Sequence, residues 1–411
     1  QALLKRLASC LVHRGPDGEG TLWHAGDRVG LAHRRLSVID TSVAGAQPMV
    51  SASGRLAIAF NGEIVNAPEL AAELRRAGVR FRGHSDTETL LQAIEAWGIE
   101  RALERIAGMF AFAVHDRGER VVHLVRDRLG IKPMHYAWIG GESTGTLAFA
   151  SEVRALLEMP GFRREIDAQG VAGFMARGCV TGSTSIWKGV RKLGAGEWMR
   201  CALGSGATQI RRYWDALGVA TRGCNDPLLG SDAAVLDQAE ALLRRVLGEN
   251  LLSDVPVACF LSGGVDSAAV AMFAHANDPS SKVHAFTLGF KEAAFDERAD
   301  AGRLAARIGM QSTQAEIVET DMLALVPDLA EIYDEPFADS SQIATVHLCR
   351  TMRKHAVVAL SGDGGDEVFG GYNRHVQAMV RWSAGAAPGG WLSGLLARGL
   401  LGLSREATES L

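Results

Sequence analysis

Short apolar segments in the first half of the chain alternate with polar residues and are separated by glycine, proline and charged turns. This alternation has the period of two that is typical of half-buried strands. Helical periodicity interrupts it at residues 1–12, 67–77 and 87–97. The pattern predicts a mostly antiparallel β domain with helices. The expected strands are Val29–Leu31, Arg35–Ile39, Leu56–Phe60, Ala111–His115, Val121–Val125 and Leu147–Ala150.

The second half of the chain has a different pattern. Beyond Trp214, a stretch rich in glycine and small polar residues leads to a helical segment at Ala233–Leu247. Continuous apolar runs then alternate with helical segments, as in a parallel sheet that is covered on both faces. The length of 411 residues also favours two domains. We predict domains at residues 1–214 and 233–411, a linker at residues 215–232, and a doubly wound parallel α/β fold for the second domain.

Composition excludes several classes of protein. The hydrophobic content of 47% and the charged content of 22% are those of a globular protein, and a net charge of −4 gives no basic footprint for nucleic acid. Six scattered cysteines without a Cys-x-x-Cys pair favour a reducing compartment. We expect Trp391–Leu401 to be a helix and not a membrane span, and the first residues are not a signal peptide. The prediction is a cytoplasmic protein with no membrane or nucleic-acid partner.

The stretch Leu261–Ser267, Leu-Ser-Gly-Gly-Val-Asp-Ser, lies between an apolar run at Val255–Leu261 and a helical segment at Ala268–Ala276. A glycine turn between a strand and a helix lets backbone N–H groups approach a phosphate. No Walker lysine follows the glycines. Because Asp266 would repel a bare phosphate, we expect a bridging cation, Mg²⁺, with pyrophosphate. The alternative, an ordinary glycine-rich turn, is disfavoured by a second stretch of the same kind.

That second stretch is Ser361–Tyr372, which follows another apolar run at His355–Leu360. It contains Asp363, Asp366 and Glu367 among glycines. The carboxyl ends of parallel strands are where open α/β sheets bind ligands, and clustered carboxylates favour a cation. With Asp266 these acids could supply the one or two carboxylates that Mg²⁺ takes beside substrate phosphates. A solvated acidic loop is the alternative.

The first domain contains a second group of candidate residues. Asn61 and Gly62 could offer an amide and a backbone N–H to a developing oxyanion. Glu63 and Asp86 are carboxylates suited to an ammonium group, and Arg35 is suited to an α-carboxylate. Each signal alone is weak, since Asn-Gly is more often a hairpin turn. Together they suit an amino-acid amide.

The chain closely resembles the glutamine-dependent asparagine synthetases, a family of ATP-driven amidotransferases. The resemblance implies an N-terminal-nucleophile glutaminase domain, built as an antiparallel β sandwich with helices, followed by an ATP-pyrophosphatase domain. It also implies an ammonia tunnel between them and a homodimer as one assembly. The matching stretches are His13–Gly18, Arg35–Ser37, Asn61–Glu63, Ser85–Asp86, Arg126–Pro133, Ala150–Glu152, Leu261–Ser267, Asp334–Ser341 and Ser361–Tyr372.

The resemblance also assigns roles to individual residues. Glutamine would be bound by Arg35, Asn61, Gly62, Glu63 and Asp86, with Asn61 and Gly62 as the catalytic oxyanion hole. Asp266 and Asp366 would hold Mg²⁺, and Asp363 would act near the activated acceptor or the incoming ammonia. ATP and its pyrophosphate would contact Phe260, Ser262, Gly263, Gly264, Asp266, Ser267, Leu288, Ser361 and Gly362.

The chain departs from the family pattern in three respects. The family nucleophile is an N-terminal cysteine, which we expect to precede Gln1, since Cys10 in a helix lacks the free α-amino group that would serve as base. The family's catalytic lysine lies beyond the Gly-Gly-Tyr stretch and has no convincing match before Leu411. Val65 replaces a usual tyrosine, and Thr313-Gln314 replaces a usual His-Glu or His-Thr pair.

The expected activity combines two half-reactions. Glutamine hydrolysis releases ammonia, and ATP with Mg²⁺ adenylates a carboxylate that ammonia converts to an amide. Aspartate is the default acceptor, which would give asparagine, glutamate, AMP and pyrophosphate. A uronic acid or a secondary-metabolite carboxylate is an alternative acceptor. Two further hypotheses are a cyclising ligase related to β-lactam synthetases, without glutaminase activity, and a non-catalytic sensor.

Overall fold

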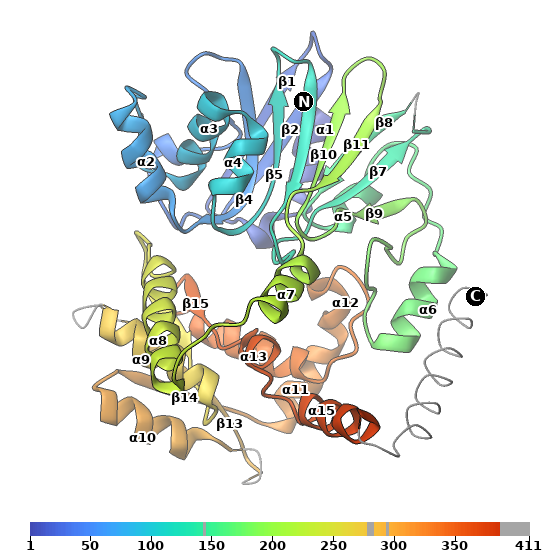
Figure 1. Ribbon diagram of the computed structural model, residues 1–411. Coiled ribbons are helices and arrows are strands. Elements are labelled where there is room, and N and C mark those ends of the chain that lie inside the picture. Colours follow the sequence, from blue (N-terminus) through green and yellow to red (C-terminus); the bar gives the residue numbers. More distant parts are fainter. Residues whose placement is uncertain (143–144, 278–282, 293–295, 387–411) are drawn as a thin grey trace.

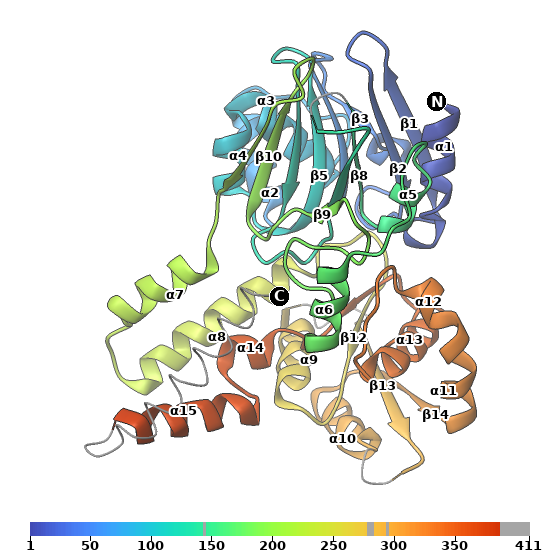
Figure 2. The same cartoon turned by 90° about the vertical axis from the view of Figure 1, so that its right-hand side faces the viewer.

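The computed structural model describes residues 1–142, 145–277, 283–292 and 296–386. An N-terminal domain of antiparallel sheets and a C-terminal domain with a parallel sheet lie one above the other in Figure 1. The helices α6 (Ala168–Arg177) and α7 (Ala216–Asn225) lie at their junction (Figures 1 and 2). Within the described ranges, no helix combines the length and the apolar character that a membrane crossing needs.

The N-terminal domain contains three antiparallel sheets with the strand orders β1-β2, β11-β10-β6-β5-β4-β3 and β8-β7-β9. Among the described residues, no other sheet pairs with the β1–β2 hairpin, whose register runs from Gly18 opposite Arg35 to His24 opposite Val29; Arg35 also forms an isolated bridge with Pro16. The strands are β1 (Gly18–His24), β2 (Val29–Arg35), β3 (Met49–Val50), β4 (Leu56–Ile64), β5 (Gly108–Asp116), β6 (Val121–Arg126), β7 (His135–Ile139), β8 (Thr146–Ala150), β9 (Val190–Lys192), β10 (Glu197–Ala202) and β11 (Thr208–Arg212).

Helices cover one face of the six-stranded sheet, and shorter elements lie around its other face. The first group packs as a cluster in Figure 1 and comprises α2 (Ala67–Arg76), α3 (Asp86–Trp97) and α4 (Ile99–Arg105). The remaining helices of this domain are α1 (Ala2–Ser9), η1 (Val12–Arg14), η2 (Val43–Gly45), α5 (Val153–Leu157) and α6.

The alternation of side chains along β4 and β5 produces two different faces. Large residues such as Ile58, Phe60 and Phe112 point to the core that α2, α3 and α4 cover. The intervening residues, including Ala57, Ala111 and Ala113, point to a second core beneath β2 and β7. Because alanine fills little volume, this second face leaves room between the sheets, and the cavity described below lies there.

The C-terminal domain contains four parallel strands in the order β14-β13-β12-β15. The chain runs outward from β12 to β14 and then returns to the opposite side of β12, so the switch point of the sheet lies between β12 and β15. The strands are β12 (Val257–Phe260), β13 (His284–Phe290), β14 (Ser312–Ile317) and β15 (Val358–Leu360).

Helices cover both faces of this sheet. Cys259 contacts the core formed with α9 and α10, whereas its neighbour Ala258 packs with Met352 of α13 on the other face. The helices are α8 (Asp232–Glu249), α9 (Val265–Asn277), α10 (Arg298–Ile308), α11 (Glu319–Leu325), η3 (Val326–Asp328), α12 (Leu329–Ile332), α13 (Ser341–Met352), α14 (Gly365–Phe369) and α15 (Asn373–Ala386). The predicted fold classes of both domains are therefore confirmed.

One predicted strand is absent from the structure, and the predicted linker contains a helix. The segment Arg35–Ile39 is not a strand, because β2 ends at Arg35 and the following residues form the loop that surrounds its side chain. Residues 215–232, expected to be a linker, contain the helix α7, which the Asp215 side chain caps by accepting from Gly218 N. The predicted helix at Trp391–Leu401 lies outside the described residues.

Candidate functional site

All five residues predicted to bind glutamine line one cavity of about 1040 Å³ in the N-terminal domain. They are Arg35, Asn61, Gly62, Glu63 and Asp86. The cavity lies between the β1–β2 hairpin and the alanine-bearing face of the six-stranded sheet. Its size is at the upper end of what small-molecule sites occupy.

Asn61 and Gly62 occupy adjacent positions near the end of β4, opposite Ala111 and Phe110 of β5. The Asn61 Nδ2 amide is buried and has no hydrogen-bond partner. A Cβ atom at Gly62 would lie 2.2 Å from the Met109 carbonyl oxygen, so only glycine fits there. A buried donor without a partner is costly, and a ligand oxygen in the cavity would satisfy it.

Glu63 and Asp86 form an electrostatically strained pair beside that amide. Burial, with the nearby Asp86 charge, raises the pKa of Glu63 to about 6. Burial likewise raises the pKa of Asp86 to about 6, although its carboxylate accepts hydrogen bonds from Ile64 N at 3.0 Å and Thr87 N at 2.7 Å. Two carboxylates that are buried near each other favour a cation between them.

Arg35 lies at the end of β2 with its guanidinium against the following loop. Its Nη1 donates to the Ser42 carbonyl at 2.9 Å, and its Nη2 donates to the carbonyls of Ile39 and Asp40. These three bonds leave the Nε–H and one Nη1–H of the five guanidinium donors. The loop therefore fixes the orientation of Arg35 while leaving two donors for an anion.

Two further residues of this cavity were not among the predicted ligands. Lys132 lines it, and burial lowers the pKa of its ammonium while the Glu63 charge opposes that shift. His33 also lines it, with Nε2 2.9 Å from the Phe60 carbonyl oxygen and a buried Nδ1 without a partner. Burial lowers the pKa of His33 to about 4, so its imidazole is neutral. Lys132 belongs to the Arg126–Pro133 stretch and His33 lies two residues before the Arg35–Ser37 stretch, so the family resemblance was the signal that could have found them.

The cysteines near this cavity do not have the properties of an activated thiol. Cys10 caps the end of α1, its Sγ lies 3.4 Å from the Arg6 carbonyl oxygen, and burial raises its pKa. Cys201 lines the cavity from β10, where it is buried and burial again raises the pKa of the thiol. A nucleophilic cysteine needs a lowered pKa or an adjacent base.

The predicted pyrophosphate loop lies at the switch point of the parallel sheet, between β12 and α9. The Ser262 and Ser267 hydroxyls are 2.7 Å apart, and Ser262 N donates to Ser267 Oγ at 3.1 Å. Gly264 N donates to Ser262 Oγ at 3.1 Å, and Gly263 N donates to the Glu297 carboxylate at 3.0 Å. The loop therefore already binds an anionic oxygen through Gly263, and sequence reasoning missed Glu297 entirely.

The second acidic stretch packs directly against this loop. A Cβ atom at Gly365 would lie 2.3 Å from Asp266 Oδ2, and one at Gly362 would lie 2.9 Å from Ser267 N. Gly362 and Gly365 in the second stretch thus leave room for Asp266 of the first. Asp366 lies in the first turn of α14 with its carboxylate against Gly371, and the exposed Asp363 accepts a hydrogen bond from Ser361 Oγ at 3.0 Å.

Two predicted nucleotide contacts lie on the strands beside these loops. Phe260 is the last residue of β12, and Leu288 is two residues beyond Phe286, the residue of β13 that pairs with Phe260. Both side chains are half-buried. The structure thus places the predicted nucleotide residues on β12 and β13, in the loops after β12 and β15, and, for Asp266 and Ser267, in the first turn of α9.

The two domains contact each other through residues of the Asp334–Ser341 stretch. The Glu335 carboxylate accepts from Ser185 Oγ at 2.7 Å and Ile186 N at 2.8 Å, and lies 2.5 Å from Lys192 Nζ. Burial alone would raise the pKa of Glu335, but hydrogen bonds led by those from His135 and Lys192 lower it to about 2.

A second contact links motif stretches of both domains. The Asp334 carboxylate accepts from Arg154 N at 3.0 Å, and the Arg154 guanidinium lies 2.8 Å from Glu152. Glu152 in turn is 3.0 Å from His13 Nε2 and 2.9 Å from Arg14 Nη1. Three stretches that the sequence marked separately therefore meet at the domain interface.

Two family models match the chain, one in each domain. Residues 1–214 match the glutamine amidotransferase domain, and residues 238–410 match asparagine synthase. The chain thus joins an amidotransferase sandwich to a synthase domain with a parallel sheet.

The chain belongs to the family of glutamine-dependent asparagine synthetases. It is 33% identical to glutamine-hydrolyzing asparagine synthetase 1 of Bacillus subtilis, over 91% of this chain and 56% of the relative. Two relatives bear the name of putative glutamine-hydrolyzing asparagine synthetase. That of Mycobacterium tuberculosis H37Rv is 36% identical over 90% of this chain and 56% of the relative. That of Methanocaldococcus jannaschii is 30% identical over 91% and 73%. The chain thus spans little more than half the length of the first two.

A solved structure of glutamine phosphoribosylpyrophosphate amidotransferase from B. subtilis is more distant. It has a TM-score of 0.38 and 17% identity, over 75% of this chain and 61% of that chain. At this distance it does not bear on the function of the chain.

Proposed function

We propose that the full-length protein is a glutamine-hydrolysing, ATP-dependent amidotransferase that converts a substrate carboxylate to an amide. One observation is the main support for the glutamine-hydrolysing half-reaction. The unpartnered amide of Asn61 and the two carboxylates with raised pKa values, Glu63 and Asp86, line the same cavity. An amino-acid amide supplies the oxygen and the ammonium that this arrangement lacks.

Each end of glutamine has a matching group in the cavity. The ammonium group would lie with Glu63 and Asp86, where it restores the ionised forms of both carboxylates. The α-carboxylate would accept from the two free donors of Arg35. The carboxamide oxygen would face Asn61 Nδ2 and the Gly62 N–H, which stabilise the oxyanion of a tetrahedral intermediate.

Glutamine hydrolysis in this cavity needs a nucleophile, and in the family to which the chain belongs this would be the thiolate of an N-terminal cysteine. Its free α-amino group would accept the thiol proton. Attack on the carboxamide releases ammonia and leaves a thioester, which water hydrolyses to glutamate.

The C-terminal domain would bind ATP at the switch point of its sheet. ATP supplies the chemistry of adenylation, which would convert an unreactive carboxylate into an acyl adenylate with release of pyrophosphate; ammonia can attack this mixed anhydride and displace AMP. The donors of Ser262, Gly263 and Ser267 would face the pyrophosphate, and Glu297 would leave Gly263 N as it binds. The fit to an anion is supported by the carboxylate oxygen that Gly263 N already contacts.

Mg²⁺ fits the acids around this loop. Asp266 and Asp366 would hold the ion, whose charge would offset that of the pyrophosphate. The fit is supported by Asp266, whose carboxylate packs on Gly365 in the neighbouring loop that also carries Asp366. Asp363 and Ser361, which hydrogen bond to each other at the same edge, would lie beside the activated acceptor.

Aspartate is the acceptor that we propose first, since the named relatives are asparagine synthetases. The relatives also include one named amidase chry2 of Gibberella zeae, 29% identical over 88% of this chain and 54% of the relative. The same chemistry on another carboxylate, such as a uronic acid, is therefore the second proposal. A cyclising ligase without glutaminase activity is disfavoured by the complete set of glutamine groups in the cavity.

The test is ATP-dependent pyrophosphate release by the full-length protein, with amide-¹⁵N glutamine as donor and a panel of carboxylates as acceptors. Label in asparagine that depends on aspartate would support the first proposal. Label in the amide of another acid would show that this acid is the acceptor and would leave the proposed mechanism unchanged. Pyrophosphate release without label transfer would refute the glutaminase half and favour the cyclising ligase.

A further inference from the structure

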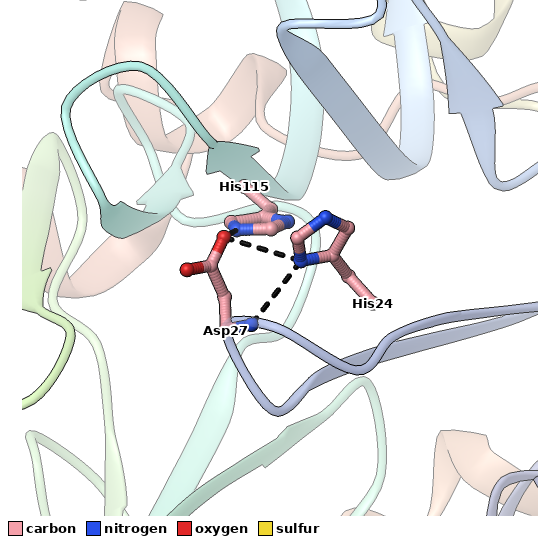
Figure 3. A group of neighbouring side chains, drawn as sticks. All are labelled: His24, Asp27 and His115. Carbon is pink, nitrogen blue, oxygen red and sulfur yellow. Dashed lines mark hydrogen bonds and ion pairs between the residues drawn. The ribbon is translucent and has the colours of Figure 1, made fainter.

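His24, Asp27 and His115 form a compact cluster at the tip of the β1–β2 hairpin, outside the residues assigned to glutamine or ATP (Figure 3). His24 ends β1, Asp27 lies in the hairpin turn, and His115 lies near the end of β5. Asp27 Oδ2 is 3.0 Å from His115 Nε2 and 3.2 Å from His24 Nδ1. Both imidazole rings are turned toward the carboxylate in Figure 3.

The hydrogen bonds within the cluster leave acceptor atoms in contact. His24 Nδ1 accepts from the Asp27 backbone N–H at 3.2 Å, so the lone pair of a neutral ring lies on that nitrogen. The same nitrogen lies 3.2 Å from the acceptor Asp27 Oδ2. Either a proton or a metal ion on Nδ1 would remove this repulsion, and each would take the lone pair that now accepts from Asp27 N. A metal ion differs from a proton in that His115 Nε2 can bind it as well.

The three ligand atoms have the spacing that a small metal ion requires. They all lie within 4.8 Å of one another. Bonds of about 2.0–2.2 Å to nitrogen and oxygen in a tetrahedral site place neighbouring ligand atoms roughly 3.3 Å apart. The observed 3.0 and 3.2 Å separations from Asp27 Oδ2 are within a few tenths of an ångström of this value, and the two ring nitrogens, which lie within 4.8 Å of each other, would both turn toward the ion.

The surroundings fix two of the three ligands. The His115 side chain is 1% exposed and that of Asp27 is 10% exposed. Arg120 Nε lies 3.5 Å from Asp27 Oδ1, which orients the carboxylate so that Oδ2 faces the two rings. The His24 side chain is 29% exposed, so the site has an open side for water.

We propose that His24 Nδ1, Asp27 Oδ2 and His115 Nε2 bind one divalent transition-metal ion of the Zn²⁺ class, with water completing the coordination. Two imidazoles and one carboxylate suit such ions and not Mg²⁺, which prefers oxygen ligands. The ion ties the hairpin to the six-stranded sheet. This matters because, in the part of the chain that the structure describes, no other sheet pairs with the hairpin, and Asp27 and Arg120 also line the cavity that contains the residues predicted to bind glutamine.

The test is titration of the full-length, reduced, chelator-treated protein with Co²⁺ in the presence of Mg²⁺. We expect one equivalent of Co²⁺ to give the visible absorption of a nitrogen and oxygen environment, without a sulfur-to-cobalt charge-transfer band, and Zn²⁺ to displace it. His24→Gln and Asp27→Asn should weaken Co²⁺ binding at least about 100-fold, since even outer partners of metal ligands are worth about 10–100-fold.

His347→Gln on α13 is the matched control and should bind Co²⁺ as the wild type does. Zn²⁺ should also raise the melting temperature of the wild type and of the control by a few degrees, and that of His24→Gln by less. Near-ultraviolet circular dichroism establishes that the variants are folded. Equal Co²⁺ affinity in wild type and His24→Gln would overturn the proposal. Failure of Co²⁺ to bind would also overturn it and leave a hydrogen-bonded triad that shares a proton.

Discussion

The cavity around Asn61 and the loop around Asp266 differ in how far their polar groups are satisfied within the chain. In the cavity, Asn61 Nδ2 has no partner, and burial raises the pKa values of two carboxylates. In the loop, the Ser262 and Ser267 hydroxyls bond each other, and Gly263 N is occupied by Glu297. The first site presents a buried donor without a partner, whereas the second would have to exchange internal partners for a ligand.

This difference follows from the architecture. The cavity residues lie at the ends of paired strands and at the start of a helix, where ladder hydrogen bonds fix the backbone and glycine is required sterically. The loop residues lie where two strands diverge, and Gly263 and Gly264 are exposed. Preorganised dipoles act without reorganisation during the reaction. We therefore expect substitutions in the glutamine site to change mainly kcat and the pH dependence of the reaction. We expect substitutions in the ATP site to remove most of the ATP-dependent activity.

The largest effect should come from Asp266→Asn, which removes the proposed Mg²⁺ ligand without changing its shape. ATP-dependent pyrophosphate release should fall about 10³-fold, as expected for the loss of a charged group that stabilises a phosphoryl transition state. Glutamate release from glutamine should be unchanged because the cavity lies in the other domain. Asp321→Asn, an exposed acid on α11, is the matched control. Unchanged pyrophosphate release would remove Asp266 from the site.

Asn61→Ala should have the next largest effect and should act on the other domain. Loss of one oxyanion donor typically lowers kcat by about 10²–10³-fold. KM for glutamine should change little, because the amide contacts the developing charge more than the ground state. The measurement is steady-state glutamate release, with the exposed Asn225→Ala as control. A rise in KM at constant kcat would contradict an oxyanion role and indicate simple substrate binding.

How far the sequence predicts these sites depends on whether the responsible contacts are local. The loop Leu261–Ser267 was predictable as a turn because a strand and a helix follow one another there along the chain, and the Asn61–Gly62 pair was predictable because it directly follows the predicted strand Leu56–Phe60. Lys132, His33 and Glu297 were not predicted as site residues, since each approaches its partner through sheet packing or a distant loop. Apart from the position of Lys132 and His33 in or beside stretches that resemble the family, nothing in the local pattern distinguishes the three from ordinary polar residues.

The motif stretches at the domain interface could be recognised in the sequence, but their role in joining the two domains could not be predicted from it. His13–Gly18, Ala150–Glu152 and Asp334–Ser341 resemble the family, yet their local sequence contains no physical reason for the resemblance. In the structure Glu152, Arg154 and Asp334 connect the two domains. A sequence pattern identifies such residues, but only the tertiary arrangement shows that they hold an interface.

Acidification should weaken glutamine binding by a smaller, graded amount. Because the pKa values of Glu63 and Asp86 are raised to about 6, the ionised pair that an ammonium needs is lost as the pH falls below about 6. KM for glutamine should be flat above pH 7 and rise about tenfold per unit for each carboxylate below pH 6. Asp86→Asn should weaken binding at all pH values and flatten this dependence.

The stability of the ligand-free protein should change in the opposite direction. A carboxyl whose folded pKa lies above its ordinary value contributes stability that is present below pH 4 and is lost as the pH rises through about 6. Bound L-glutamate should reverse this loss, so its stabilising effect should be larger at pH 7.5 than at pH 5. Equal stabilisation at both values, measured by thermal unfolding, would mean that the carboxylates do not hold the ammonium group.

The smallest effect on either half-reaction, but a specific effect on their coupling, should come from Lys192→Met. Lys192 and Glu335 side chains are 15% and 13% exposed, so the variant leaves a largely buried carboxylate without its cation and should destabilise the interface by about 2–3 kcal/mol. Glutamate release and ammonia-driven pyrophosphate release should each stay within about twofold of wild type, because neither site contains Lys192.

The ratio of glutamine hydrolysed to amide formed should rise, since ammonia escapes where the domains separate. Lys188→Met breaks the exposed Lys188–Glu165 pair, 66% and 49% exposed, and should leave the ratio unchanged. If Lys192→Met and Lys188→Met give the same ratio, the contact through Glu335 does not couple the glutamine cavity to the ATP loop.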